Sequence, residues 1–194
     1  PLLIYVGRLD AQKKPHIVAE AFRKLPESLG ARLVLLGEGP LRDEIAALKD
    51  PRIHTPGFVR DRQELAKWLA SADVYVSAMA DETFGVSIVE AQASGLPVVG
   101  VAAGAMIDRV TDAIGRLGPV DDSDAMAANI LSVWNADRGR MSEIAQAEAR
   151  QYSWDRSMDA LFGQLYRKAF NARSQRLVES PVRVREALAG VPAE

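Results

Sequence analysis

Two glutamates, Glu82 and Glu90, lie on either side of Gly85, a residue at which a helix could begin. If a helix begins there, the backbone N–H groups of about Phe84, Gly85 and Val86 have no acceptor within the helix and carry partial positive charge. A helix start of this kind binds anions. Glu90 lies more than a turn further along, and because helical side chains lean toward the N-terminus, its carboxylate can reach groups attached to the bound anion.

A carboxylate near a bound phosphate is expected to accept hydrogen bonds from neutral hydroxyl groups, such as those of a ribose. Glu90 is positioned to accept from a ribose of this kind, whereas Glu82 lies in the segment ahead of the helix. The pattern therefore predicts a nucleotide that carries a sugar at its far end, facing Glu82.

The residues around these two glutamates resemble a known signature. Glu82 and Glu90 have seven residues between them, in the sequence E-T-F-G…E-A, and residues 94–99 read S-G-L-P-V-V. This combination resembles the E-x7-E motif of retaining glycosyltransferases of the GT-B type, most closely family 4, the glycosyl transferases group 1. The resemblance covers about residues 2–170. It implies the C-terminal, donor-binding half of an enzyme that transfers a sugar from a nucleoside diphosphate sugar to an acceptor, without a metal or another cofactor.

Two basic residues, Arg8 and Lys13, follow the first apolar run in the sequence GRLDAQKK. Two cations suit a diphosphate, the arginine as a planar fork and the lysine as a point charge. The resemblance implies a catalytic set of Arg8, Lys13 and Glu82, in which the two cations stabilise charge on the departing diphosphate and Glu82 holds the sugar hydroxyls. In the family the basic residue is usually followed by glycine, whereas Lys14 stands here, so the choice between the two lysines stays open.

The resemblance also implies a set of donor-binding residues. Val59, in the sequence G-F-V, is carried over as a main-chain contact to the nucleobase. Because main-chain contacts leave little trace in side-chain identity, the sequence does not distinguish uracil, guanine and adenine. The donor-binding set is Gly7, Gly37, Val59, Phe84, Gly85, Val86 and Glu90.

Apolar runs that read as buried strands alternate with segments of helical periodicity. The runs are residues 2–6, 32–36, 52–55, 74–77, 97–101 and 114–117. This alternation predicts an α/β, Rossmann-like parallel sheet of about six strands, with helices on both faces and further helices after residue 123. The carboxyl ends of such strands share one edge, where ligands bind, and the candidate residues all follow strands there. Within the glutamate-bearing helix, we expect Val86, Val89 and Ala93 to face the sheet.

Two other motifs resemble a dinucleotide-binding loop and a metal site, but neither fits well. Gly37-Glu38-Gly39 follows a predicted strand, as in a dinucleotide-binding loop, but Arg42 stands at the third small position and the next strand ends without an acid for a ribose. Residues 121–124, D-D-S-D, mimic a metal-binding D-x-D. Acids and a serine directly before a helix are more simply an N-cap, so we expect no metal site.

Composition narrows the class of protein. The 194 residues are 48% hydrophobic, and the net charge of −2 gives no electrostatic reason to expect nucleic-acid binding. There is no cysteine for a disulfide or a thiolate, and no apolar run approaches the roughly 20 residues of a membrane span. We therefore expect a cytoplasmic protein, whose full-length form could also act at a membrane surface.

The chain begins with Pro1, and a predicted strand follows almost at once. We therefore expect a piece of a longer protein that lacks an N-terminal acceptor domain, its partner in catalysis, so that the fragment alone is inactive. Residues 1–170 are expected to form the nucleotide-sugar-binding domain and residues 171–194 a C-terminal extension, flexible rather than docked. The function favoured is a hexosyltransferase. The alternatives are a non-catalytic nucleotide-binding or interaction module, and a relative of nucleotide-sugar epimerases or of glycogen phosphorylase.

Overall fold

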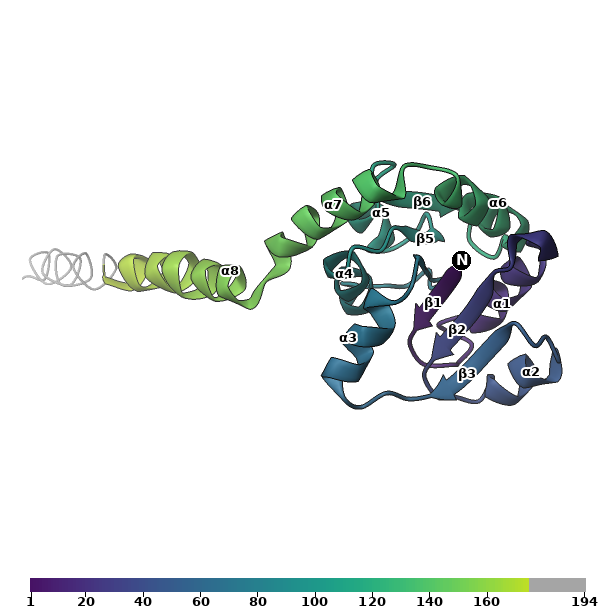
Figure 1. The fold of residues 1–194 in the computed structure, drawn as a ribbon. Helices are drawn as coiled ribbons and strands as arrows, with labels where there is room; N and C mark the ends of the chain where they lie inside the picture. Colours follow the sequence, from purple (N-terminus) through teal and green to yellow (C-terminus); the bar gives the residue numbers. More distant parts are fainter. Residues whose placement is uncertain (175–194) are drawn as a thin grey trace, which may run out of the picture. The chain divides into compact units, whose positions relative to one another are not determined.

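Six parallel strands form one sheet in the computed structural model, which describes residues 1–174 (Figure 1). The strands are β1 (Leu2–Val6), β2 (Arg32–Leu36), β3 (Ile53–Gly57), β4 (Val74–Val76), β5 (Val98–Val101) and β6 (Gly115–Gly118). Their order is β3-β2-β1-β4-β5-β6, so the direction of winding reverses between β1 and β4. This is the Rossmann strand order, and the reversal creates a crevice at the carboxyl ends of β1 and β4. The predicted α/β fold is confirmed.

The sheet has a separate hydrophobic core on each face because successive side chains of a strand point to opposite sides. In β1, Leu3 and Tyr5 belong to one core and Ile4 to the other, and all three are almost completely buried. Strand β2 divides in the same way, since Leu33 contributes to the first core and Val34 to the second. The continuous apolar runs are therefore a direct result of burial on both faces.

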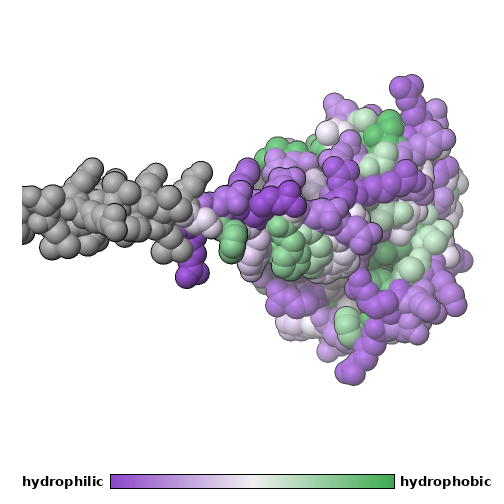
Figure 2. All heavy atoms as spheres, turned by 90° about the vertical axis from the view of Figure 1, so that its left-hand side faces the viewer, coloured by the Kyte–Doolittle hydropathy of each residue, from purple (hydrophilic) through white to green (hydrophobic). Residues whose placement is uncertain are grey.

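Helices cover both faces. The first core contains side chains from α1 (Pro15–Arg23), α2 (Arg42–Ala47), α6 (Ser123–Trp134) and α7 (Arg138–Ala149). The second contains side chains from α3 (Arg62–Ala70), α4 (Val86–Ala93) and α5 (Met106–Arg109). Short 3₁₀ helices span Glu27–Leu29 and Arg150–Tyr152. Figure 2 shows mostly hydrophilic side chains on one face of the described residues, with smaller hydrophobic areas between them.

Aspartate side chains cap the starts of α3 and α6. Asp61 accepts hydrogen bonds from the backbone N–H groups of Gln63 and Glu64 at the start of α3. Asp122 accepts from the N–H of Ala125, at 2.8 Å, at the start of α6. The N-cap interpretation of the acidic run at residues 121–124 is therefore confirmed for Asp122.

The expected orientation of α4 is wrong. Ile88, Ala91 and Gln92 are buried in place of the expected set, and Val86 is 60% exposed. The helix begins at Val86, after Gly85 in the left-handed conformation with φ of 79°. Apolar residues occur on every side of this short helix, so their spacing did not fix which side faces the sheet.

A compact unit, Pro1–Arg150, contains the whole sheet, and a second unit begins at Gln151. The described part of the second unit is helical, with α8 (Trp154–Met158) followed by a π-helix at Asp159–Tyr166. The compact unit thus ends before residue 170, and residues 175–194 of the expected extension lie outside the described residues. Within residues 1–174, no helix is both long enough and apolar enough to cross a bilayer.

Candidate functional site

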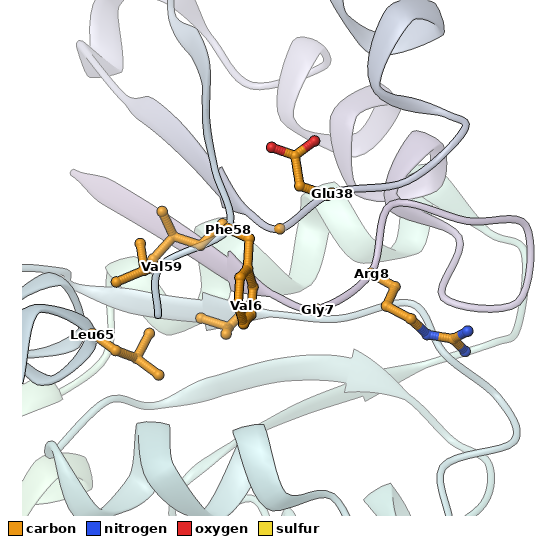
Figure 3. A pocket seen from close by; sticks show the side chains of 9 residues that line it. Val6, Gly7, Arg8, Glu38, Phe58, Val59 and Leu65 are labelled. Carbon is orange, nitrogen blue, oxygen red and sulfur yellow. The ribbon is translucent and has the colours of Figure 1, made fainter. Parts of the chain in front are cut away.

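A cavity of about 300 Å³ lies at the carboxyl ends of β1, β2 and β3. Its lining is Val6, Gly7, Arg8, Leu36, Gly37, Glu38, Phe58, Val59 and Leu65. Figure 3 shows Val59, Phe58 and Leu65 around Val6, whereas the guanidinium of Arg8 points away from this group. The cavity thus has an apolar side that suits a flat ring. Its charged side carries Arg8, in the loop that follows β1.

The backbones of two loops meet closely at the edge of this cavity. The N–H of Gly7 donates to the carbonyl of Leu36, and the N–H of Gly37 donates to that of Gly57, both at 3.0 Å. A Cβ atom at Gly37 would lie 1.8 Å from the carbonyl oxygen of Gly7. Only glycine therefore fits at position 37, and its place in the predicted set has a steric reason.

The structure brings Lys13 and Glu82 together from segments 69 residues apart. The Lys13 Nζ atom donates to Glu82 Oε2 at 2.9 Å, and the two side chains are only 21% and 14% exposed. The other carboxylate oxygen, Oε1, accepts from the backbone N–H of Gly85 at 3.1 Å. Two predicted catalytic residues and the start of α4 therefore form one charged cluster.

The backbone around Lys13 separates it from its neighbour Lys14. The N–H of Lys13 donates to Asp10 Oδ1 at 2.9 Å, and Lys14 adopts the left-handed conformation with φ of 51° at the start of α1. The Lys14 ammonium then pairs with Asp121 at 2.6 Å, away from Glu82. Arg8, with a side chain that is 66% exposed, pairs with Asp10 at 3.1 Å and is not brought to Glu82.

One of the predicted anion-binding N–H groups, that of Val86, lies in the first turn of α4. Helical hydrogen bonding begins with the N–H groups of Ile88 and Val89, which both donate to Gly85, so those of Val86 and Ser87 have no acceptor within the helix. The N–H of Gly85, predicted to be available, instead donates to Glu82. The first turn therefore offers donors beside the Lys13–Glu82 pair.

Phe84 and the loop after β5 fix the segment ahead of α4. The guanidinium of Arg109 lies 4.6 Å from the centre of the Phe84 ring and donates to the Phe84 carbonyl at 3.2 Å. The carbonyl of Glu82 accepts from Ala105 at 2.7 Å, and a Cβ atom at Gly104 would lie 2.6 Å from the same oxygen. The main chain of Glu82 is therefore held from two sides.

Glu90 lies in the next turn of α4, beside a smaller cavity of about 170 Å³. Its Oε1 atom accepts from Arg62 at 2.5 Å, and its side chain is 22% exposed. Leu65 lines both this cavity and the larger one, so Glu90 is a near neighbour of the apolar cavity. Arg62 was not predicted as a site residue, because an arginine at the start of a surface helix has no distinguishing sequence pattern.

Tyr75 is a second residue that the sequence analysis missed. Its hydroxyl lies 2.8 Å from Ser87 Oγ and 3.4 Å from the carbonyl of Val6, where β1 and β4 diverge. Burial raises the pKa of Tyr75 well above its ordinary value, so the phenol stays protonated and supports the start of α4. The available signal was a tyrosine in an otherwise aliphatic strand, because a buried phenol needs a hydrogen-bond partner.

Comparisons with known proteins place this geometry in context. The family model described as glycosyl transferases group 1 matches residues 1–136. The chain is 33% identical over 189 residues to the D-inositol 3-phosphate glycosyltransferase of Xylanimonas cellulosilytica, covering 91% of the chain and 44% of that protein. It is 30% identical over 177 residues to the GDP-mannose-dependent alpha-(1-6)-phosphatidylinositol dimannoside mannosyltransferase of Mycobacterium tuberculosis, covering 89% of the chain and 45% of that protein.

Among solved structures, the chain resembles Anabaena HepE in complex with UDP-glucose, with a TM-score of 0.67 and 26% identity. This match covers 77% of the chain and 44% of HepE. The chain therefore spans less than half the length of each of these three relatives.

Proposed function

The chain belongs to the glycosyl transferases group 1 family, and we propose that it is the donor-binding half of a retaining glycosyltransferase of family 4. The whole enzyme would transfer a hexosyl group from a nucleoside diphosphate sugar to an acceptor, without a metal or another cofactor. A separate N-terminal domain would supply the acceptor site. We further propose that the enzyme is cytoplasmic, with a surface that allows it to act next to a membrane.

One observation carries this proposal: Lys13 and Glu82 meet at the start of α4, and an apolar cavity lies on the same edge of the sheet, at the carboxyl ends of β1, β2 and β3. A cation, a carboxylate and a helix start are the groups that a sugar linked to a diphosphate requires. The apolar cavity on the same edge of the sheet suits a nucleobase. The relatives' names support the same class of donor, since one is GDP-mannose-dependent and another was solved with UDP-glucose.

The proposed donor lies across the carboxyl edge of the sheet. The base occupies the cavity of Phe58, Val59 and Leu65, and the ribose hydroxyls donate to Glu90. The diphosphate lies between Lys13 and the first turn of α4, within reach of the flexible side chain of Arg8. The proposed arrangement rests on two links: Leu65 lines both the cavity for the base and the one beside Glu90, and the Lys13–Glu82 pair lies at the start of α4.

The geometry supports Lys13 over Lys14 as the diphosphate ligand. Lys14 has φ of 51°, the left-handed conformation that glycine adopts without cost, and glycine is the usual residue after the basic residue of the motif. Lys14 therefore occupies the glycine position, and Lys13 is the basic residue itself. Its ammonium is also the one that lies at Glu82.

The test is a binding screen on the 194-residue chain. Thermal shift and calorimetry with UDP, GDP and ADP, each against its nucleoside and its hexose conjugate, measure which ligands stabilise the folded state. We expect one diphosphate and its sugar conjugate to bind at least about tenfold more tightly than the nucleoside, because a charge-assisted contact is worth roughly 1.5–3 kcal/mol. Equal affinities for all nucleosides and diphosphates would overturn the proposal.

The same chain should transfer no sugar to added acceptors, since it spans less than half of its relatives and the proposed acceptor domain lies outside it. A radiolabelled donor and candidate acceptors would measure transfer directly. Sustained transfer by this chain alone would place the acceptor site within it and contradict the two-domain proposal.

A further inference from the structure

The carboxylate of Glu82 contacts Lys13, which the proposed function assigns to the diphosphate, and the backbone N–H directly ahead of the first turn of α4. Its Oε2 atom accepts from the Lys13 ammonium at 2.9 Å and its Oε1 atom from the Gly85 N–H at 3.1 Å. Carboxylates and phosphates use the same charge-assisted hydrogen bonds and both bind at helix starts. In the free chain, therefore, part of the predicted anion site already holds an anion.

We propose that Glu82 acts as an internal ligand of the diphosphate site, and that this makes the site select nucleoside diphosphate sugars over bare nucleoside diphosphates. The proposal rests on the proposed function and adds a specificity role for Glu82. A diphosphate that takes the place of Glu82 at Lys13 displaces the carboxylate, because two anions held side by side on one ammonium repel each other.

The displaced carboxylate then needs new hydrogen-bond donors. The Glu82 side chain is only 14% exposed, so water reaches it poorly, and an unsatisfied charged group in such a place is costly. A bare diphosphate offers only acceptor oxygens at neutral pH and adds negative charge. A hexose offers hydroxyl donors, which replace the lost bonds. Only the sugar-bearing ligand therefore replaces the hydrogen bond that Glu82 loses when Lys13 turns to the diphosphate.

The surroundings allow the side chain, but not the backbone, to move. The Glu82 carbonyl accepts from the Ala105 N–H at 2.7 Å, and Gly104, the residue before Ala105, approaches the same carbonyl oxygen closely. Both contacts use the main chain, so they persist when the carboxylate turns away from Lys13. The exchange between internal and external anion therefore needs a side-chain rotation and no rearrangement of the fold.

The test compares Glu82→Gln with a matched control, Asp121→Asn. Glutamine keeps the size of the side chain and can still accept from the Gly85 N–H, but it releases the Lys13 ammonium. Asp121→Asn removes one negative charge from the adjacent Lys14 pair, whose ammonium and carboxylate lie 2.6 Å apart. Any difference between the two variants therefore comes from the Glu82 position and not from net charge.

Calorimetry would use UDP with UDP-glucose and GDP with GDP-mannose on all three chains. In Glu82→Gln we expect the dissociation constant of the bare diphosphate to fall about fivefold. We expect the ratio of the two dissociation constants, diphosphate over sugar conjugate, to fall about tenfold. The scale is that of releasing one partly exposed ion pair and losing one charge-assisted hydrogen bond. Asp121→Asn should change both affinities by less than about twofold.

The outcomes distinguish a failure of the internal-ligand proposal from a failure of the proposed donor-binding function. If the wild-type chain binds a diphosphate and Glu82→Gln binds it no more tightly, the internal-ligand proposal is wrong and the donor-binding function stands. If no chain binds any diphosphate or conjugate, the proposed function fails, and this inference fails with it. If Glu82→Gln does not fold by circular dichroism, Glu82→Ala provides the same test, because alanine also removes the carboxylate and releases the Lys13 ammonium.

Discussion

Charge removal at Lys13, compared with the same change at Lys14, tests the central contact of the proposed site. Lys13→Gln should weaken nucleoside diphosphate binding because it removes a charge-assisted hydrogen bond worth roughly 1.5–3 kcal/mol. The wild-type chain gives up the Lys13–Glu82 pair when the diphosphate binds, a loss of up to about 1 kcal/mol that the variant avoids. With that 1 kcal/mol subtracted, the net effect should be about 0.5–2 kcal/mol, or a dissociation constant raised about 2- to 30-fold.

Lys14→Gln is the control because it makes the same change in net charge one residue away. The Lys14 ammonium pairs with Asp121, so its removal should alter diphosphate affinity by less than about twofold. Calorimetry in about 0.1 M salt, where the Debye length is about 10 Å, limits effects from distant charges. The corresponding nucleoside should bind both variants equally. A loss at Lys14 as large as the loss at Lys13 would refute the assignment.

Three further predictions concern the ribose, the β1–β2 contact and acid stability. Glu90→Gln should weaken a nucleoside and its diphosphate alike, by about tenfold, since both carry the ribose; calorimetry showing a loss for the diphosphate alone would contradict this. Gly37→Ala should cost about 3 kcal/mol or more in urea unfolding because its Cβ would meet a backbone oxygen at 1.8 Å, whereas Gly30→Ala, with φ of 63° and no atom within 4 Å, should cost only about 1–2 kcal/mol. Hydrogen bonding to Arg52 lowers the pKa of Asp50 from 3.8 to about 2. This depressed pKa stabilises the fold above pH 3.8, and the effect is lost as the pH falls toward 2. Asp50→Asn should therefore remove about 2 kcal/mol of the stability that the wild type loses between pH 3.8 and 2. Urea unfolding at several pH values measures this, and a free energy of unfolding that depends on pH equally in variant and wild type would argue against the Asp50–Arg52 pair.

The sheet was predictable because its signals are strong and local. The first two apolar runs match β1 and β2 residue for residue, since each is buried on both faces and ends at a glycine. Strand β3 was expected at residues 52–55 but continues through Pro56 to Gly57. It is an edge strand, so a proline costs it no hydrogen bond in the sheet interior. The four-residue helix α5 was missed because it is too short to show a period.

The contacts of the candidate site were less predictable, because they depend on backbone conformations that side-chain patterns do not record. The sheet topology places the loops that follow its strands at one edge, and it does not say which side chains from those loops meet. Two adjacent lysines illustrate the problem, since their side chains are chemically identical. Lys14 takes a left-handed conformation directly before Pro15. An ordinary residue is strained there because it has a Cβ atom and because a proline follows it. At this turn the Lys13 side chain pairs with Glu82 and the Lys14 side chain with Asp121.

That strain is itself informative about the site. A left-handed lysine costs about 1–2 kcal/mol relative to glycine, so the surrounding contacts must hold the turn in place. The structure contains such contacts on both sides of it: Asp10 accepts from the Lys13 N–H, and Asp121 pairs with Lys14. The turn therefore fixes the direction of the Lys13 side chain before any ligand binds. A cation held in advance beside a helix start loses little conformational freedom on binding, which is the condition under which one lysine can contribute its full charge-assisted contact to a diphosphate.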